Sequence, residues 1–134
     1  MQDYAAERVR SLLARFVFEL NRAAKGGRDP EKIHALRVSV RRLGQALRAF
    51  HQFFPQKQVK RIRKRLRSLM RCAAAVRDRD IALALLERAG AGKGVAAEEL
   101  RRERKLAERG LERELRGWMA NNFSSKWRSA LHLL

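Results

Sequence analysis

The apolar residues of this chain recur at alternating steps of three and four along most of its length. One run of seven comprises Ile33, Leu36, Val40, Leu43, Leu47, Phe50 and Phe54. A second run of six comprises Val59, Ile62, Leu66, Leu69, Ala73 and Val76. An average step of about 3.5 residues is typical of helices that pack lengthwise on one another. With seven Val, three Ile and no Thr, the chain is also short of the residues that favour strands.

Glycine, proline and asparagine divide these runs into separate helices. We expect long helices at about 3–25, 30–53, 56–89 and 95–120, and a short one from about 124. Asp29 is the expected N-cap of the second, with Pro30 at its first helical position. Aspartate favours caps over helix interiors, so the pair at 78 and 80 predicts a kink or break, with Asp78 capping residues 79–89. The expected fold is all-α: an antiparallel bundle of four long helices plus a short C-terminal helix, in one domain spanning residues 1–134.

Positive charge is concentrated in the middle of the chain. The whole sequence has 32 Lys and Arg against 14 Asp and Glu, a net charge of +18. Residues 31–71 hold thirteen of those cations and a single acid, Glu31, and so carry two-thirds of the net charge. A basic surface that served only solubility would be spread more evenly. The concentration therefore indicates a polyanionic partner.

The basic residues form stripes beside the apolar ones. In the second expected helix the stripe comprises His34, Arg37, Arg41, Gly44, Arg48 and His51, and from His34 to Arg48 it spans roughly 21 Å. In the third it comprises Lys57, Lys60, Lys64, Arg67 and Arg71, with Arg61 and Arg65 flanking. Like charges at this spacing repel unless an anion neutralises them. The alternative is a solvated face whose long side chains cover the edge of the core. Residues 98–116 mix Glu with Arg, and that contrast favours anion binding.

Two motifs of the sequence are similar to those of a known family. The first runs Ile33-His-Ala-Leu-Arg-Val-Ser-Val-Arg-Arg-Leu43, followed by Ala46-Leu-Arg-Ala-Phe50. It resembles the pattern hydrophobic-His-x-x-Arg-Val-x-x-Arg-Arg-Leu-Arg-x-x-Leu of the CHAD domain (conserved histidine α-helical domain). The second, Val76-Arg-Asp-Arg-Asp80, resembles the Val-Arg-Asp-x-Asp element of the same family. The resemblance covers residues 31–90 well, and the rest of the chain only in the order of its helices.

The resemblance implies an all-helical domain that binds inorganic polyphosphate in a basic channel; some members occur on polyphosphate granules. It implies that residues of the first motif contact polyphosphate and that basic residues of the third helix join them. The implied contacts are His34, Arg37, Arg41, Arg42, Arg48, Lys57, Lys60, Arg61, Lys64, Arg65, Arg67 and Arg71. His34 is either one of these contacts or a buried core histidine. Arg77 and Asp78 form a structural ion pair or cap, or else contact the ligand.

The chain departs from the family pattern in two ways that matter here. Gly44 stands where an arginine is usual. A typical CHAD domain also contains two pseudo-repeats, each with its own basic helix, whereas this chain has one. We therefore expect a homodimer in which two chains complete the channel about a two-fold axis. The apolar residues near the end are either that interface or ordinary core of one bundle; they are Trp118, Trp127, Leu131, Leu133 and Leu134.

Other functions fit the sequence less well. RNA is the alternative ligand through backbone contacts, but the basic stripes lack interleaved aromatics for base stacking. The segment from Gly90 to Gly94 does not have the spacing of a phosphate-binding loop, and nothing indicates a catalytic residue, a cofactor or a metal site. A lone cysteine, Cys72, fits a reducing compartment, and no apolar run approaches the roughly 20 residues that span a membrane. We expect a non-catalytic, cytoplasmic protein that binds polyphosphate or another linear polyanion and no membrane.

Overall fold

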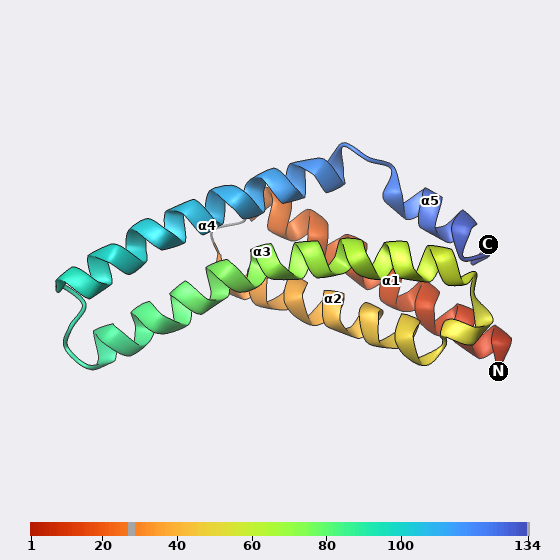
Figure 1. Cartoon of the computed structure of the whole chain (residues 1–134), viewed down its shortest axis with the longest axis horizontal. Helices are drawn as coiled ribbons and strands as arrows, with labels where there is room; N and C mark the ends of the chain where they lie inside the picture. The colour runs from red at the N-terminus through yellow and green to blue at the C-terminus, as the bar shows by residue number, and fades with distance from the viewer. Residues whose placement is uncertain (27–28, 134) are drawn as a thin grey trace.

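The computed structural model describes residues 1–26 and 29–133, which form helices and no strand (Figure 1). The elements are α1 (Gln2–Gly26), α2 (Pro30–Ala49), the short 3₁₀ helix η1 (His51–Phe53), α3 (Gln56–Arg88), α4 (Val95–Met119) and α5 (Phe123–Ala130). The all-α fold of four long helices plus a short C-terminal one is thereby confirmed. In the described part of the chain, no helix is both long and apolar enough to cross a membrane.

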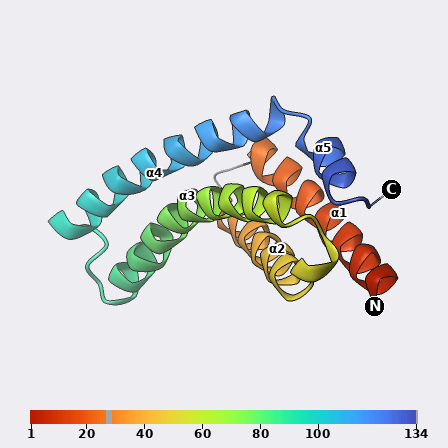
Figure 2. The same cartoon turned by 45° about the vertical axis from the view of Figure 1, so that its right-hand side comes forward.

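Consecutive long helices run in opposite directions and pack through the predicted apolar stripes (Figures 1 and 2). Ile33, Leu36 and Leu47 of α2 are fully buried, as is Leu69 of α3. Residues that follow each other by three or four share one face of a helix, so each stripe presents a continuous apolar surface. The core is built where these surfaces meet, between α1, α2 and α3 and against the second half of α4.

The ends of α2 follow from its sequence. The Asp29 side chain accepts a hydrogen bond from the Glu31 backbone N–H at 3.0 Å, and Pro30 begins the helix, so the predicted N-cap is confirmed. At the other end α2 stops at Ala49, four residues earlier than expected. Pro55 disfavours helical geometry in the residue before it, and Phe54 is extended, with φ −130° and ψ 157°. The chain closes the gap with the 3₁₀ turn η1.

The predicted interruption of the third helix is wrong. Helix α3 continues without a break past Asp78, which caps nothing and is exposed; Figure 2 shows a curved but uninterrupted ribbon. The physical reason lies on α4, where Arg104 binds the carboxylate of Asp80. A tertiary partner gives this carboxylate the hydrogen bond that it would otherwise take from a helix N-terminus.

The C-terminal segment is fastened to the bundle by aromatic and backbone contacts. The Trp118 ring lies 5.3 Å from Phe16 and 4.8 Å from Phe123, in edge-to-face geometry. Arg10 on α1 donates two hydrogen bonds, of 2.8 and 2.6 Å, to the Leu133 carbonyl. Trp118, Leu131 and Leu133 are buried, and Trp127 packs against them. These residues are core of one bundle and form no exposed interface; Leu134 lies outside the described residues.

One part of the molecule extends beyond the bundle. We call residues 77–110 the arm: the second half of α3, the following turn and the first part of α4, at the left of Figure 1. No residue of α3 after Val76 is fully buried, and before Leu111 the buried residues of α4 are Ala97 and Glu108. The two helices of the arm are therefore packed mainly on each other.

Two phenylalanines on α1 test this description of the core. Phe16 is 0% exposed at the centre of the aromatic cluster, whereas Phe18 is 52% exposed. Phe16→Ala should lower the free energy of unfolding by about 3–5 kcal/mol, because it removes a buried ring and leaves a cavity. Phe18→Ala, the matched control, should cost less than about 1 kcal/mol. Urea unfolding followed by circular dichroism measures both, and equal losses would contradict the assignment of the core.

Candidate functional site

A groove with only basic charge lies between α2 and α3. It has a volume of about 190 Å³. The residues that line it are Val40, Arg41, Gly44, Gln45 and Arg48 of α2 and Arg63, Leu66, Arg67 and Met70 of α3. Four arginines and no acid border this small space, so its charge is the kind that an anion would neutralise.

The groove follows directly from the way the two helices pack. Arg41 and Arg48 each come one residue after a member of the buried stripe of α2, and Arg63 and Arg67 do the same on α3. One residue is a turn of about 100° around a helix axis. Because the two stripes face each other, the residues just beyond them emerge along the same seam. The arginines therefore meet at the border of the core.

Several predicted contacts continue this face beyond the groove lining. His34 is exposed, so the alternative of a buried core histidine is wrong. His34 and Arg37 precede Arg41 on the same stripe of α2. Lys60 lies three residues before Arg63 and Arg71 four residues after Arg67, and both are exposed. The face that the groove belongs to thus extends along both helices.

Other predicted contacts lie elsewhere. Arg42 lines a separate hollow of about 160 Å³ between α1 and α2, together with Arg15 and Glu19. Arg65 faces α4, where its guanidinium carbon lies 4.5 Å from the centroid of the Trp118 ring. The remaining three are exposed on α3 outside the groove lining; they are Lys57, Arg61 and Lys64. The structure therefore does not bring all twelve predicted residues into one site.

Arg63 is the groove residue that the sequence analysis missed. The basic stripe predicted for α3 comprises Lys57, Lys60, Lys64, Arg67 and Arg71, and it does not include Arg63. The useful signal was position relative to the buried stripe. Arg63 follows Ile62 in the same way that Arg41 follows Val40. Applied to both helices, this rule selects the four arginines of the groove, and also Arg37 and Arg77, which lie outside its lining.

Arg37 carries an unmet hydrogen-bond donor close to the groove. The side chain is half-buried, and its Nε atom is buried without a hydrogen-bond partner in the described structure. A buried donor without a partner costs free energy, more so on a charged group. It lies one helical turn from Arg41, at the end of the groove nearer the start of α2. This donor is covered by the protein and lies outside the groove lining, so a ligand would reach it only if the Arg37 side chain moved.

One residue of the second motif, Asp80, has a structural role. Asp80 accepts a hydrogen bond from Arg104, which also binds Glu108, so this set ties α3 to α4 at the base of the arm. The hydrogen bond that Arg104 donates to Asp80 raises the pKa of Arg104 above its ordinary value. Arg77 is half-buried and Asp78 exposed, and neither forms an ion pair within the described ranges. Whether these two contact a ligand stays a prediction.

The site offers little to covalent or metal chemistry. Cys72 is half-buried, and burial, with Glu114 as a second cause, raises the pKa of its thiol. The reactive thiolate therefore forms only at a higher pH than in an ordinary cysteine. Among the residues that the structure describes, no three His, Cys, Asp or Glu side chains are grouped as a metal ion would require. What the arrangement can do is bind an anion.

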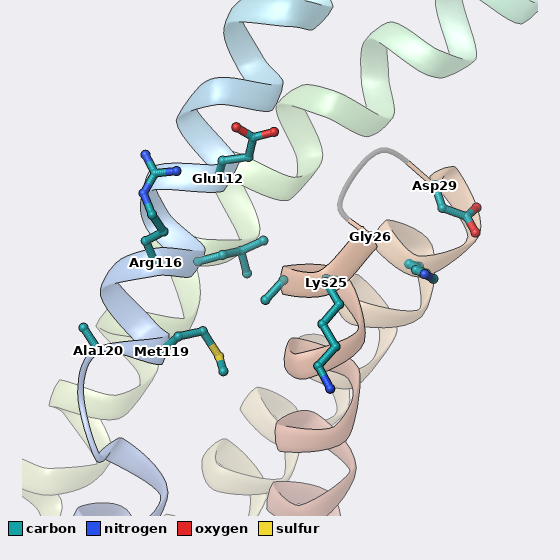
Figure 3. A pocket seen from close by; sticks show the side chains of 11 residues that line it. Lys25, Gly26, Asp29, Glu112, Arg116, Met119 and Ala120 are labelled. Atoms are coloured by element: carbon teal, nitrogen blue, oxygen red, sulfur yellow. The ribbon is translucent and has the colours of Figure 1, made fainter.

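A larger hollow shows why charge, and not volume, identifies the site. It measures about 1000 Å³ and lies between the end of α1, the start of α2 and the end of α4 (Figure 3). Lys25 and Arg116 stand on opposite walls, but Asp29 and Glu112 accompany them, and Met119 reaches inward from α4. Its mixed charge and apolar lining do not suit a polyanion. The groove between α2 and α3 is much smaller but carries one sign of charge.

Comparison with known proteins gives one match. The family model of the CHAD domain matches residues 5–133, nearly the whole chain. No curated protein and no solved structure matches the sequence.

The two aspartates of the second motif allow a paired test of its role. Asp80→Asn should lower the free energy of unfolding by roughly 1–3 kcal/mol, because the half-buried Arg104 then loses one of the two carboxylates that it contacts. Asp78→Asn, two residues away and exposed, should change it by less than about 0.5 kcal/mol. Denaturant unfolding of both variants measures the difference. If the two variants were equally stable, the Asp80–Arg104 contact would not contribute to holding α3 and α4 together within the arm.

Proposed function

Because the chain belongs to the CHAD domain family, we propose that it binds inorganic polyphosphate, or another linear polyanion, in the groove between α2 and α3, without catalysing a reaction on it. The observation that carries the proposal is the set of four arginines around an open groove that contains no acid. Arginine presents a planar fork of donors that matches phosphate oxygens in pairs. We further propose that the protein is cytoplasmic and that binding of polyphosphate at this site brings it to polyphosphate granules.

The shape of the basic face favours a chain of charges over a single phosphate. From His34 to Arg48 the α2 stripe spans roughly 21 Å, and α3 supplies a parallel row of cations. A short anion would neutralise only part of this face. A linear polyanion would neutralise it along its length and release the counterions of both molecules. Affinity should therefore rise with ligand length and fall with salt.

The lining of the groove favours polyphosphate over RNA. Its apolar members are Val40, Leu66 and Met70, and no aromatic side chain is among the lining residues. Recognition of single-stranded RNA commonly adds base stacking on aromatics to its phosphate contacts. Gln45 is the one amide in the lining. The groove therefore offers little that would recognise a base.

Removal of two groove arginines tests the position of the site. Arg63→Ala combined with Arg67→Ala should weaken polyphosphate binding roughly a hundredfold or more, since each charged hydrogen bond contributes about 1.5–3 kcal/mol. The slope of log affinity against log salt should also fall by about two, one for each lost phosphate contact. Fluorescence anisotropy with labelled polyphosphate, repeated at several salt concentrations, gives both quantities.

A matched double variant separates the groove from the general positive charge. Arg109 and Arg113 have the same spacing on α4, are exposed, and lie outside the groove lining. Arg109→Ala combined with Arg113→Ala removes the same charge and should change the affinity less than threefold, roughly 0.7 kcal/mol. If the two double variants lost affinity equally, binding would depend on net charge and not on this groove.

Gly44 allows a test by gain of function. It lines the groove, and a Cβ added there would meet no atom within 4 Å. Gly44→Arg restores the residue usual in the family, so it should tighten polyphosphate binding several-fold and steepen the salt dependence. Gly117 on α4 is equally open and serves as the control. Gly117→Arg adds the same charge and the same helix propensity, about 1 kcal/mol, away from the groove. Equal effects on binding would contradict the proposed site.

A further inference from the structure

The arm carries apolar side chains that nothing in the described chain covers. Ile81 and Leu85 are 46% and 57% exposed. They belong to a hollow of about 480 Å³ along one face of the arm. Its lining residues are Pro30, Arg77, Asp80, Ile81, Leu83, Ala84, Leu85, Glu87, Arg88 and Arg104. An apolar surface bordered by charged side chains is typical of a protein contact.

This face is the uncovered continuation of a packed one. One side of α3 continues from the groove into the arm. It includes Arg63, Arg67 and Met70 in the groove and, at helical spacing further along, Arg77, Ile81 and Ala84 in the arm. In the bundle, α2 packs beside that side of α3, but α2 begins at Pro30, which stands at the edge of the hollow. Beyond Pro30 no helix of the described chain lies beside that side of α3, as Figure 1 shows for the far end of the arm. A helix that took the place of α2 here would bury Ile81 and Leu85.

The distribution of charge indicates which partner covers this face of the arm. The arm has nine Lys and Arg against seven Asp and Glu, so it is nearly neutral, while the rest of the chain carries almost all of the +18. Two copies of so basic a protein repel each other over the bundle, and the arm is where the repulsion is weakest. Glu87 and Arg88 give the edge of the hollow both signs of charge. A patch with both signs can pair with itself about a two-fold axis.

We propose that a second copy of this chain docks on this face of the arm, forming a two-fold dimer in which Ile81 and Leu85 of the two copies pack together. In such a contact, Glu87 of one copy can reach Arg88 of the other. The apolar residues of the C-terminus cannot supply the interface, because Trp118, Leu131 and Leu133 are buried in the bundle. The dimer does not rest on the proposed function.

The mass of the protein in solution, measured without any polyanion, tests the proposal. Sedimentation or light scattering at physiological salt should show a dimer for the natural sequence. Leu85→Glu should give a monomer, because each interface would then bury two unpaired carboxylates. The matched control is Leu106→Glu: Leu106 is also on the arm and 65% exposed, but it lies outside the hollow, so this variant should stay dimeric.

Circular dichroism of both variants should match the natural protein, since both leucines are exposed. A monomeric natural protein would overturn the proposal, as would a Leu85→Glu variant that remains dimeric. Equal dissociation by Leu85→Glu and Leu106→Glu would place the interface on another face of the arm and would overturn it as well. Polyphosphate titrations of the same samples measure binding separately from mass. Failure to form the dimer can therefore be told apart from failure to bind a polyanion.

Discussion

The packing of α2 against α3 determines where every other feature of the basic face lies. Each helix contributes an apolar stripe with the same period, and the two stripes bury each other along the seam. The residue after each stripe position therefore emerges beside the seam, and in this sequence it is often arginine. A core contact between leucines and valines thus holds the cations in register. A shift of either helix by one residue would turn its arginines away from the groove.

This arrangement places many like charges close together, which opposes folding. Helix α3 has eight Lys and Arg between residues 57 and 71 and no acid. The apolar core and the aromatic cluster around Trp118 offset that repulsion, and Arg65 is directed against the Trp118 ring, away from the groove. An anion that binds the folded state would relieve the remaining repulsion and stabilise the protein by mass action. Stability and ligand binding are therefore coupled through the same arginines.

Local signals predicted the fold well. Apolar spacing predicted the buried stripes, and Asp29 with Pro30 predicted the start of α2. The errors came from tertiary contacts. Asp78 and Asp80 suggested a break because their local preference is for caps, but Arg104, on a different helix, holds Asp80 inside α3. Arg63 and Arg65 differ by only two residues, yet one faces the groove and the other a tryptophan of α4. Helical spacing shows which residues border the buried stripe, but it does not show which neighbouring helix they face. The sequence therefore could not predict which cations line the groove, which lie between α1 and α2, and which face α4.

The most direct test of the central claim is a competition titration at physiological salt. Labelled long-chain polyphosphate, bound to the full chain, is challenged with RNA, single-stranded DNA, heparin and pyrophosphate at equal charge concentration. The account predicts that unlabelled long-chain polyphosphate displaces the label well below the concentration at which the other polyanions do, and that pyrophosphate fails. If all long polyanions competed equally, the basic face would be a general polyanion surface, and a polyphosphate-selective groove would be contradicted.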